Sequence, residues 1–188
     1  VYKDGEYHLY FQHNPYGSMW GNMHWGHSVS KDLVHWEHLD PAIARDTLGH
    51  IFSGSAVVDT KNSAGYGENT MVAFYTSASD KNGQIQCMAY STDNGRTYTK
   101  YENNPILTPF DGLKDFRDPK VFWYEPDQKW VMVVSADKEM RFYSSRNLKD
   151  WEFMSGFGEG YGVQPSQFEC PDFIQLLSLI HISEPTRQ

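Results

Sequence analysis

The chain has 188 residues, a formal net charge of −8, and 39% hydrophobic and 15% aromatic residues. The hydrophobic content suffices for one core, while the negative charge and the absence of a Lys/Arg run argue against nucleic acid or an anionic membrane as a partner. No stretch approaches the roughly 20 apolar residues of a membrane-spanning helix, and Cys87 and Cys170 are too few for a disulfide framework.

Three short apolar runs, rich in β-branched and aromatic residues, lie at residues 6–14, 70–78 and 129–137. Gly, Asp or Asn flanks each run, and none continues with the 3.6-residue period of an amphipathic helix, so they predict buried β-strands. The Asp-Gly and Asn-Gly pairs in KDGEY (3–7) and STDNGRTY (91–98) favour tight turns, because glycine adopts positive φ without steric cost. These patterns predict an all-β fold.

An internal repeat joins HSVSKDLVHWEHL (27–39), AYSTDNGRTYTKY (89–101) and FYSSRNLKDWEFM (142–154). In each, a strand ends in Ser, a polar turn follows, and an aromatic residue opens the next strand, so that Trp36 and Trp151 correspond and are both expected in the core. A period of about 50 to 60 residues with about four strands per unit predicts the blades of a β-propeller. A β-sandwich with coincidental turns is the alternative.

Short elements precede the second and third apolar runs, FSGSAVVD (52–59) and FRDPKVFWYE (116–125), and a third element of this kind, FECPDFIQL (168–176), follows about one period later. The first strand of a propeller blade lines the central channel, so Ser53, Asp118 and Glu169, which recur at the blade period, are expected to converge there. We expect Arg117 to hold the Asp118 carboxylate ionised and Pro119 to fix the strand entrance. A carboxylate pair in a channel favours acid–base chemistry. For RDP alone, a structural pair capping a turn is the alternative.

Five motifs in order, YHLYFQHNP, WGHSVSKDLVHW, FSGSAVVD, FRDP and ECPDF, resemble glycoside hydrolase family 32, the β-fructofuranosidases. The resemblance extends to about Leu176. It implies a five-bladed β-propeller, of which roughly the first half is present, and hydrolysis of terminal β-D-fructofuranosyl linkages in fructans (levan, inulin) or sucrose with retention. It implies no cofactor. The run FSGSAVVDTKNSAGYG (52–67) is closer to exo-acting levanases and inulinases than to sucrose-phosphate hydrolases.

The resemblance assigns Glu169 as general acid/base and Asp118 as transition-state stabiliser. It assigns substrate contacts to Gln12, Trp20, Phe52, Ser53 and Arg117. Retaining glycosidases place two carboxyl groups about 5–5.5 Å apart, and the acid must keep its proton near neutral pH, which burial or a like charge achieves. Cys170 is expected to be buried, either as a weak hydrogen-bond donor or as a plain core residue, and not to act as a nucleophile.

The family nucleophile is an Asp in an Asn-Asp-Pro-Asn-Gly-like motif upstream of the segment that resembles residues 1–15. Asp4 belongs to the turn after that strand, so the resemblance implies that the nucleophile is not in this chain and that residues 1–188 alone are inactive. Residues 1–176 are expected to be a partial propeller domain. LSLIHISEPTRQ (177–188) carries no blade signature and is expected to be a non-native tail.

Seven of the eight histidines lie in the first 50 residues. His24 and His27 are three apart, which places them on opposite faces of a strand, and no Cys or acidic triad completes a metal site, so none is expected. Two alternatives to a fructosidase are an arabinan-degrading five-bladed glycosidase and a non-catalytic fructan-binding propeller. WGHSVSKDLVHW beside ECPDF argues against the first, and the proton donor argues against the second. A polymeric substrate favours an extracytoplasmic location.

Overall fold

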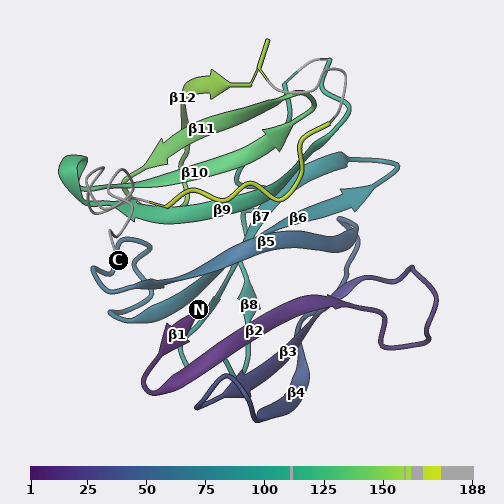
Figure 1. Ribbon diagram of the computed structural model, residues 1–188, viewed down its shortest axis with the longest axis vertical. Helices are drawn as coiled ribbons and strands as arrows, with labels where there is room; N and C mark the ends of the chain where they lie inside the picture. Colours follow the sequence, from purple (N-terminus) through teal and green to yellow (C-terminus); the bar gives the residue numbers. More distant parts are fainter. Residues whose placement is uncertain (111, 159, 162–166, 175–188) are drawn as a thin grey trace, which may run out of the picture.

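The computed structural model describes residues 1–110, 112–158, 160–161 and 167–174. In this part of the chain, twelve strands form three antiparallel sheets of four strands each, and every sheet is a meander of consecutive strands (Figure 1). The first sheet contains β1 (Tyr2–Lys3), β2 (Glu6–His13), β3 (His24–Ser30) and β4 (Trp36–Ile43). The second contains β5 (His50–Asp59), β6 (Thr70–Ser79), β7 (Gly83–Ser91) and β8 (Thr99–Lys100). The third contains β9 (Phe116–Tyr124), β10 (Lys129–Ala136), β11 (Glu139–Ser145) and β12 (Glu152–Phe157), with a 3₁₀ turn, η1 (Glu125–Asp127), after β9.

These sheets confirm the predicted all-β partial propeller. The three apolar runs are β2, β6 and β10, which are the second strands of the three sheets. FSGSAVVD and the first nine residues of FRDPKVFWYE form most of β5 and all of β9, the first strands of the second and third sheets. None of the helical segments in the described part of the chain is long and apolar enough to cross a membrane.

The sequence repeat corresponds to one kind of turn between the third and fourth strands of each sheet. The side-chain oxygens of Asp32, Asp93 and Asn147 accept hydrogen bonds from backbone amides two to four residues later. Such local bonds are why Asp and Asn favour turns. In the first and third sheets the turn places a Leu at positive φ, 65° at Leu33 and 62° at Leu148.

The two tryptophans of the repeat each make the same hydrogen bond to their own turn, but they differ in burial. Trp36 Nε1 donates to the Leu33 carbonyl and Trp151 Nε1 to that of Leu148, both at 3.1 Å. Trp151 packs edge-on against Phe74 of the second sheet, with ring centroids 5.9 Å apart. Trp36 is 36% exposed, so its expected core position is wrong. The reason is that no further sheet of the described chain covers that face of the first sheet.

The second sheet lies between the other two and is covered on both faces. Because side chains alternate along a strand, Val72 and Phe74 of β6 enter the core shared with the third sheet, while Ala73 and Tyr75 enter the core shared with the first. The first of these cores also contains Met88, Phe116, Val121, Trp130, Met132, Val134 and Tyr143, and the second contains Trp25, Ile43, Ile51, Ile85, Cys87 and Ala89.

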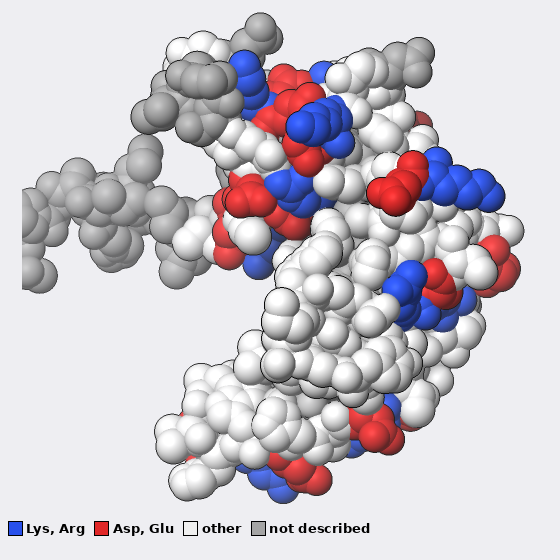
Figure 2. All heavy atoms as spheres, turned by 90° about the vertical axis from the view of Figure 1, so that its right-hand side faces the viewer, with Lys and Arg blue, Asp and Glu red and all other residues white. Residues whose placement is uncertain are grey.

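The sheets are arranged along a curve, with β5 and β9 adjacent. Ser55 Oγ of β5 donates to the Pro119 carbonyl and accepts from the Val121 amide of β9, both at 2.9 Å. Viewed from the end where β2 finishes and β5 and β9 begin, the molecule is a crescent hollowed on the side that faces the viewer in Figure 1 (Figure 2). Charged side chains gather over the third sheet, and the surface between the first and second sheets is largely uncharged.

Residues 167–174 pass beside β9 without forming a strand, which corrects the strand expected at 168–176 as far as the described residues reach. Their contacts with the third sheet follow β9 in order: Glu169 pairs with Arg117, Asp172 with Lys120, and Phe173 stacks on Phe122. The segment therefore runs parallel to β9. Residues 175–188 lie outside the described residues, and so does the expected boundary between residues 1–176 and a tail at 177–188, which stays a prediction.

Candidate active site

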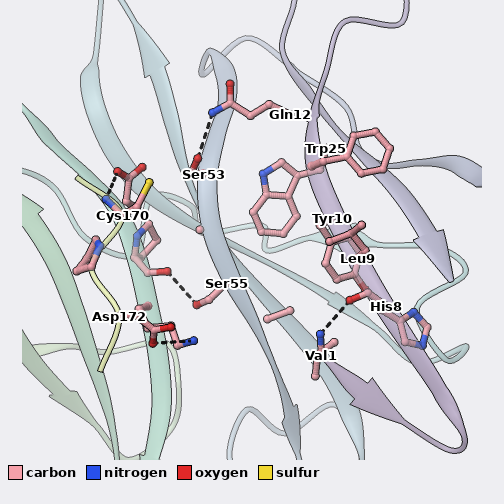
Figure 3. Close-up of a pocket in the computed structure, with 17 residues that line it drawn as sticks. Val1, His8, Leu9, Tyr10, Gln12, Trp25, Ser53, Ser55, Cys170 and Asp172 are labelled. Carbon is pink, nitrogen blue, oxygen red and sulfur yellow. Dashed lines mark hydrogen bonds and ion pairs between the residues drawn. The ribbon is translucent and has the colours of Figure 1, made fainter. Parts of the chain in front are cut away.

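A pocket of about 490 Å³ opens on the hollow side of the crescent, between β2 and β9 (Figure 3). The first sheet contributes an aromatic wall that includes Tyr10 and Trp25, and β5 forms the floor with residues 53–56. The opposite wall consists of residues 118–120 of β9 and residues 170–172. All three sheets and the 167–174 segment thus contribute to one cavity.

Asp118 is the buried carboxylate of this pocket, with 7% of the residue exposed. Its backbone has φ 64°, a left-handed conformation that is rare outside glycine. The pairing of β9 with β10 is interrupted here, because Asp118 and Pro119 together face a single residue of β10. This bulge turns the Asp118 side chain toward the 167–174 segment, where Oδ2 accepts a hydrogen bond of 2.9 Å from the Cys170 amide.

Arg117 does not pair with Asp118, so the expected role of this Arg in holding that carboxylate is wrong. Arg117 Nη2 instead lies 2.8 Å from Glu169 Oε1, and Nη1 lies 2.5 Å from Asp115 Oδ1. Gln84 of β7 joins the same group, since its Oε1 accepts from Arg117 and its Nε2 donates to Asp115. Arg117 therefore links the 167–174 segment to the second and third sheets.

Glu169 lies next to the pocket but is not among the residues that line it. Its side chain is 63% exposed and its ion pair is with a cation. The burial that was expected at the general acid is therefore not present at this side chain among the described residues. The predicted convergence is thus partial: Gln12, Ser53 and Asp118 line one cavity, and Glu169 stands at its edge.

The remaining predicted substrate contacts divide into two groups. Gln12 Nε2 donates to Ser53 Oγ at 3.1 Å, which joins β2 to β5 at the pocket rim. Trp20 is 69% exposed on the loop between β2 and β3 and lies outside the pocket lining. Its ring centroid is 6.1 Å from that of Phe52, so these two predicted residues form a separate aromatic pair beside Ser53.

Cys170 is exposed, which corrects the expectation of a buried residue. Its amide, rather than its thiol, makes the contact that orders this wall of the pocket. Partial desolvation, followed by the nearby Asp118 carboxylate, raises the pKa of the Cys170 thiol. The thiol is therefore less available as a thiolate than an ordinary cysteine, in keeping with the expectation that it is not a nucleophile.

Several pocket residues were not predicted. Ser55 lies two residues after Ser53 in the same motif, and the repeated Ser in FSGS was the signal that could have found it. Lys120 and Asp172 line the opposite wall and form an ion pair of 3.0 Å. Trp25 was visible only as one of several aromatic residues, because nothing local distinguishes a tryptophan that faces a pocket from one in the core.

His8 and His27, which the sequence did not predict to be neighbours, are in contact. His8 Nδ1 lies 3.0 Å from His27 Nε2, and both rings are buried. Their other nitrogens have no hydrogen-bond partner among the described residues. Burial, then the neighbouring His8, lowers the pKa of His27 to about 4. No group of three or more metal-ligating side chains occurs in the described ranges.

The site combines a buried carboxylate, a second carboxylate held by an arginine, amide and hydroxyl groups on the rim, and aromatic rings on one wall. Oxygen acceptors with adjacent donors suit a ligand rich in hydroxyl groups, and flat rings suit the apolar face of a sugar. Carboxyl groups on one wall can exchange protons with such a ligand. The arrangement favours a neutral carbohydrate over an anionic or apolar ligand.

Comparison with known proteins gives a consistent result. The chain is 54% identical over 180 residues to the levanase of Bacillus subtilis strain 168 and 40% identical over 204 residues to the extracellular exo-inulinase of Aspergillus awamori. These matches cover 94% of this chain in both cases, and 26% and 38% of the two relatives. The chain therefore spans between about a quarter and two fifths of the length of these relatives.

Solved structures resemble the fold as well as the sequence. The β-fructofuranosidase of Schwanniomyces occidentalis, complexed with fructosyl-erythritol, superposes with a TM-score of 0.82 at 42% identity over 90% of this chain and 34% of that one. The crystal structure of the Aspergillus awamori exo-inulinase has a TM-score of 0.78 at 40% identity, covering 84% of this chain and 36% of that one. Residues 1–182 match the Glycosyl hydrolases family 32 N-terminal domain, and the chain belongs to this family.

Proposed function

We propose that the protein of which this chain forms part hydrolyses terminal β-D-fructofuranosyl linkages in fructans or sucrose, with retention of configuration. The observation that carries the proposal is a contact within one wall of the pocket, where the buried Asp118 carboxylate of β9 accepts a hydrogen bond from the Cys170 amide, next to Glu169. Two carboxylates from separate segments are thereby held at one cavity whose other walls present hydroxyl, amide and aromatic groups. Membership of the family supports the same reaction.

Each residue then has a defined task. Glu169 protonates the leaving glycosidic oxygen and later removes a proton from the attacking water. Asp118 accepts hydrogen bonds from fructose hydroxyls and stabilises positive charge that develops on the sugar ring in the transition state. Arg117 sets the orientation of Glu169 through their ion pair, and Gln12, Ser53, Phe52 and Trp20 contact the sugar. The covalent intermediate forms on a further carboxylate, which the family resemblance places outside residues 1–188.

The function is tested by product analysis with the full-length gene product on levan, inulin and sucrose. Free fructose as the first product from at least one substrate is the expected result, and NMR of the first-formed anomer should show retention. Binding of fructan without any cleavage would instead indicate a binding propeller. Release of arabinose from arabinan, without fructose from fructans, would indicate another glycosidase family.

Glu169→Gln in the full-length gene product should lower the rate of cleavage of natural substrates by at least about 10²-fold, the usual scale for a positioned general acid. Substrates with good leaving groups should lose much less, since they need little protonation. Asp127→Asn is the matched control, because Asp127 is a similarly exposed carboxylate that pairs with Lys129 and lies outside the pocket lining. Equal losses for activated and natural substrates would count against Glu169 as the acid.

We further propose that residues 1–188 expressed alone release no fructose. Loss of a catalytic nucleophile alone costs on the order of 10⁶-fold in other enzymes. Fructose release is measured from levan, inulin and sucrose beside the full-length gene product. A rate within about tenfold of that product would show that the nucleophile lies within the chain, and Asp4, Asp59 and Asp172 would be the carboxylates to substitute next.

A further inference from the structure

The backbone of β9 departs from an extended strand at the residue that supplies the buried carboxylate. Asp118 has φ 64°, and Asp118 and Pro119 together oppose one residue of β10. A left-handed aspartate inside a strand is disfavoured and persists only where surrounding contacts impose it. The bulge also removes the Asp118 amide from the regular ladder, and Pro119 has no amide hydrogen to offer. Some other group must therefore accept a hydrogen bond from the Asp118 amide and keep the bulge of β9 in this conformation.

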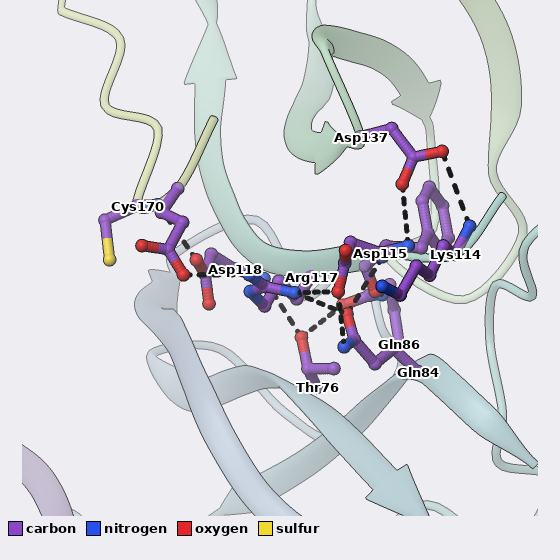
Figure 4. A network of polar contacts seen from close by, with 11 residues as sticks. Thr76, Gln84, Gln86, Lys114, Asp115, Arg117, Asp118, Asp137 and Cys170 are labelled. Carbon is purple, nitrogen blue, oxygen red and sulfur yellow. Dashed lines mark hydrogen bonds and ion pairs between the residues drawn. The ribbon is translucent and has the colours of Figure 1, made fainter. Parts of the chain in front are cut away.

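The groups that hold it come from the neighbouring sheet (Figure 4). The Asp118 amide donates to Thr76 Oγ1 at 3.0 Å, and the Thr76 hydroxyl donates to Gln86 Oε1 at 2.7 Å. Gln86 Nε2 completes the connection by donating to the Phe116 carbonyl at 2.7 Å. The chain of bonds thus returns to β9 on the other side of Arg117, and it spans the three residues 116–118.

Thr76 and Gln86 are fully buried, at 0% exposure, and directly opposite each other on β6 and β7. On β6, Thr76 also faces a second bulge, where Phe52 and Ser53 of β5 oppose it alone. One threonine therefore stands between the two irregular stretches that carry the Asp118 and Ser53 side chains into the pocket. Buried polar side chains with complete hydrogen bonding specify one local geometry, because each alternative leaves a group unpaired.

We propose that Thr76 and Gln86 are positioning residues for Asp118: they fix the bulge of β9 in the conformation that aims the carboxylate into the pocket. The expected effect on kcat rests on the proposed fructosidase function. The expected effect on the backbone of β9 does not. Neither side chain lines the pocket. Their effect on the reaction is exerted wholly through the backbone of residues 116–118.

The kinetic test uses Thr76→Val in the full-length gene product, since valine keeps the shape and removes the hydroxyl. We expect kcat to fall by about 10²-fold, the scale of a small misplacement of a catalytic group, with KM changed less than about threefold. Thr76→Ser should restore kcat to within about threefold of the parent. Thr70→Val is the matched control, because Thr70 is also a buried threonine of β6, and its hydroxyl donates to the Tyr66 carbonyl, away from the site. It should leave kcat unchanged.

A double-mutant cycle separates positioning from general stability. If Thr76 acts through Asp118, adding Thr76→Val to Asp118→Asn should lower kcat less than about threefold further, because the positioned carboxylate is already gone. Losses that multiply would overturn the proposal. Gln86→Met, which keeps the length of the side chain and removes its polar atoms, tests the other end of the chain of bonds should Thr76→Val fail to fold. It should lower kcat by about tenfold or more.

Hydrogen exchange of the Asp118 amide provides a readout that needs no activity. In the parent this amide should exchange at least about 10²-fold more slowly than an open one, and Thr76→Val should remove that protection while Thr70→Val keeps it. An unprotected Asp118 amide in the parent would overturn the proposal whatever the activity. A protected amide in a protein that releases no fructose would overturn the proposed function alone.

Discussion

The two faces of the second sheet each cover a buried polar pair, and the pairs differ in how completely they are hydrogen-bonded. Toward the third sheet, the polar atoms of the Thr76 and Gln86 side chains bond to each other and to the backbone of β9. Toward the first sheet, His8 and His27 bond to each other, while one nitrogen of each ring has no partner among the described residues. A complete network of groups that do not titrate fixes geometry, whereas a buried pair of histidines makes stability depend on protonation.

The environment of each pair explains its chemistry. Beside the histidines, Arg96 forms an ion pair of 2.6 Å with Glu6. Burial, and then the charge of Arg96, lower the pKa of His8, while Glu6 acts in the opposite direction. Tyr10 stacks on His27 at a centroid distance of 4.6 Å. The histidines are thus held neutral in an aromatic layer. The Thr76–Gln86 pair contains no titratable group, so its geometry is independent of pH.

The largest effect on stability should come from breaking the complete pair. Thr76→Val leaves the Asp118 amide and Gln86 Oε1 unpaired in a buried interface, and at about 1–3 kcal/mol for each such group the free energy of unfolding should fall by about 3 kcal/mol. Urea denaturation of the full-length gene product measures this loss. Thr76→Ser should lose less than about 1 kcal/mol. A Thr76→Val protein as stable as the parent would mean that the two pairs do not differ as described.

Acidification should act on the incomplete pair. The pKa of His27 in the folded protein is about 4, below the ordinary value near 6.5. As pH falls, the unfolded chain therefore binds a proton first, so this contribution to stability is present above about pH 6.5 and is lost progressively toward pH 4. Between pH 7 and pH 5 the loss from His27 alone should be about 2 kcal/mol, at 1.36 kcal/mol per pH unit below 6.5.

The measurement for this second prediction is the free energy of unfolding as a function of pH, with the ring of His27 followed by NMR. His13→Gln serves as control, because His13 is a half-buried histidine of β2, the strand that also carries His8, and the His27 ring should titrate in this variant as it does in the parent. An imidazole that titrates near 6.5 in the folded protein would remove the basis of the comparison.

Replacing both histidines should sharpen the comparison further. His8→Leu/His27→Leu removes the two nitrogens that have no hydrogen-bond partner, together with the two ring nitrogens that bond to each other. An exchange of a buried polar pair for apolar groups of similar size is often nearly neutral, within about 1 kcal/mol at pH 7. The variant should also lose the histidine part of the pH dependence. A destabilisation of several kcal/mol at pH 7 would show instead that the histidine pair specifies the fold of the first sheet.

The smallest effect should come from the exposed ion pair at the pocket edge. Glu169→Gln removes the negative charge from the contact with Arg117, but the Glu169 side chain is 63% exposed and Arg117 keeps its ion pair with Asp115. Exposed pairs contribute about 0–1 kcal/mol, so the free energy of unfolding should change by less than about 1 kcal/mol. Comparison with the expected loss of activity separates a residue that acts in the reaction from one that holds the fold.

Sequence alone determined the all-β class, the second strand of each sheet, the repeated turns and the family, because these depend on local patterns. Alternation and flanking turn residues mark strands such as β6 without reference to the rest of the chain. The Asp and Asn of the repeated turns bond to their own backbone, so their effect is local as well. Motif order along the chain identified Asp118 and Glu169 as candidates for the same reason.

Only the tertiary structure decided how those candidates are held. The partner of Arg117 is Glu169 rather than its neighbour Asp118, because the fold brings the 167–174 segment alongside β9. The Asp118 amide in the bulge donates its hydrogen bond to Thr76 of β6, which lies about 40 residues earlier in the chain. His8 contacts His27 only because β2 pairs with β3. Such contacts depend on which side chains the neighbouring strands and sheets bring within hydrogen-bond distance. Local sequence patterns do not predict this, because the partners lie far apart in the chain.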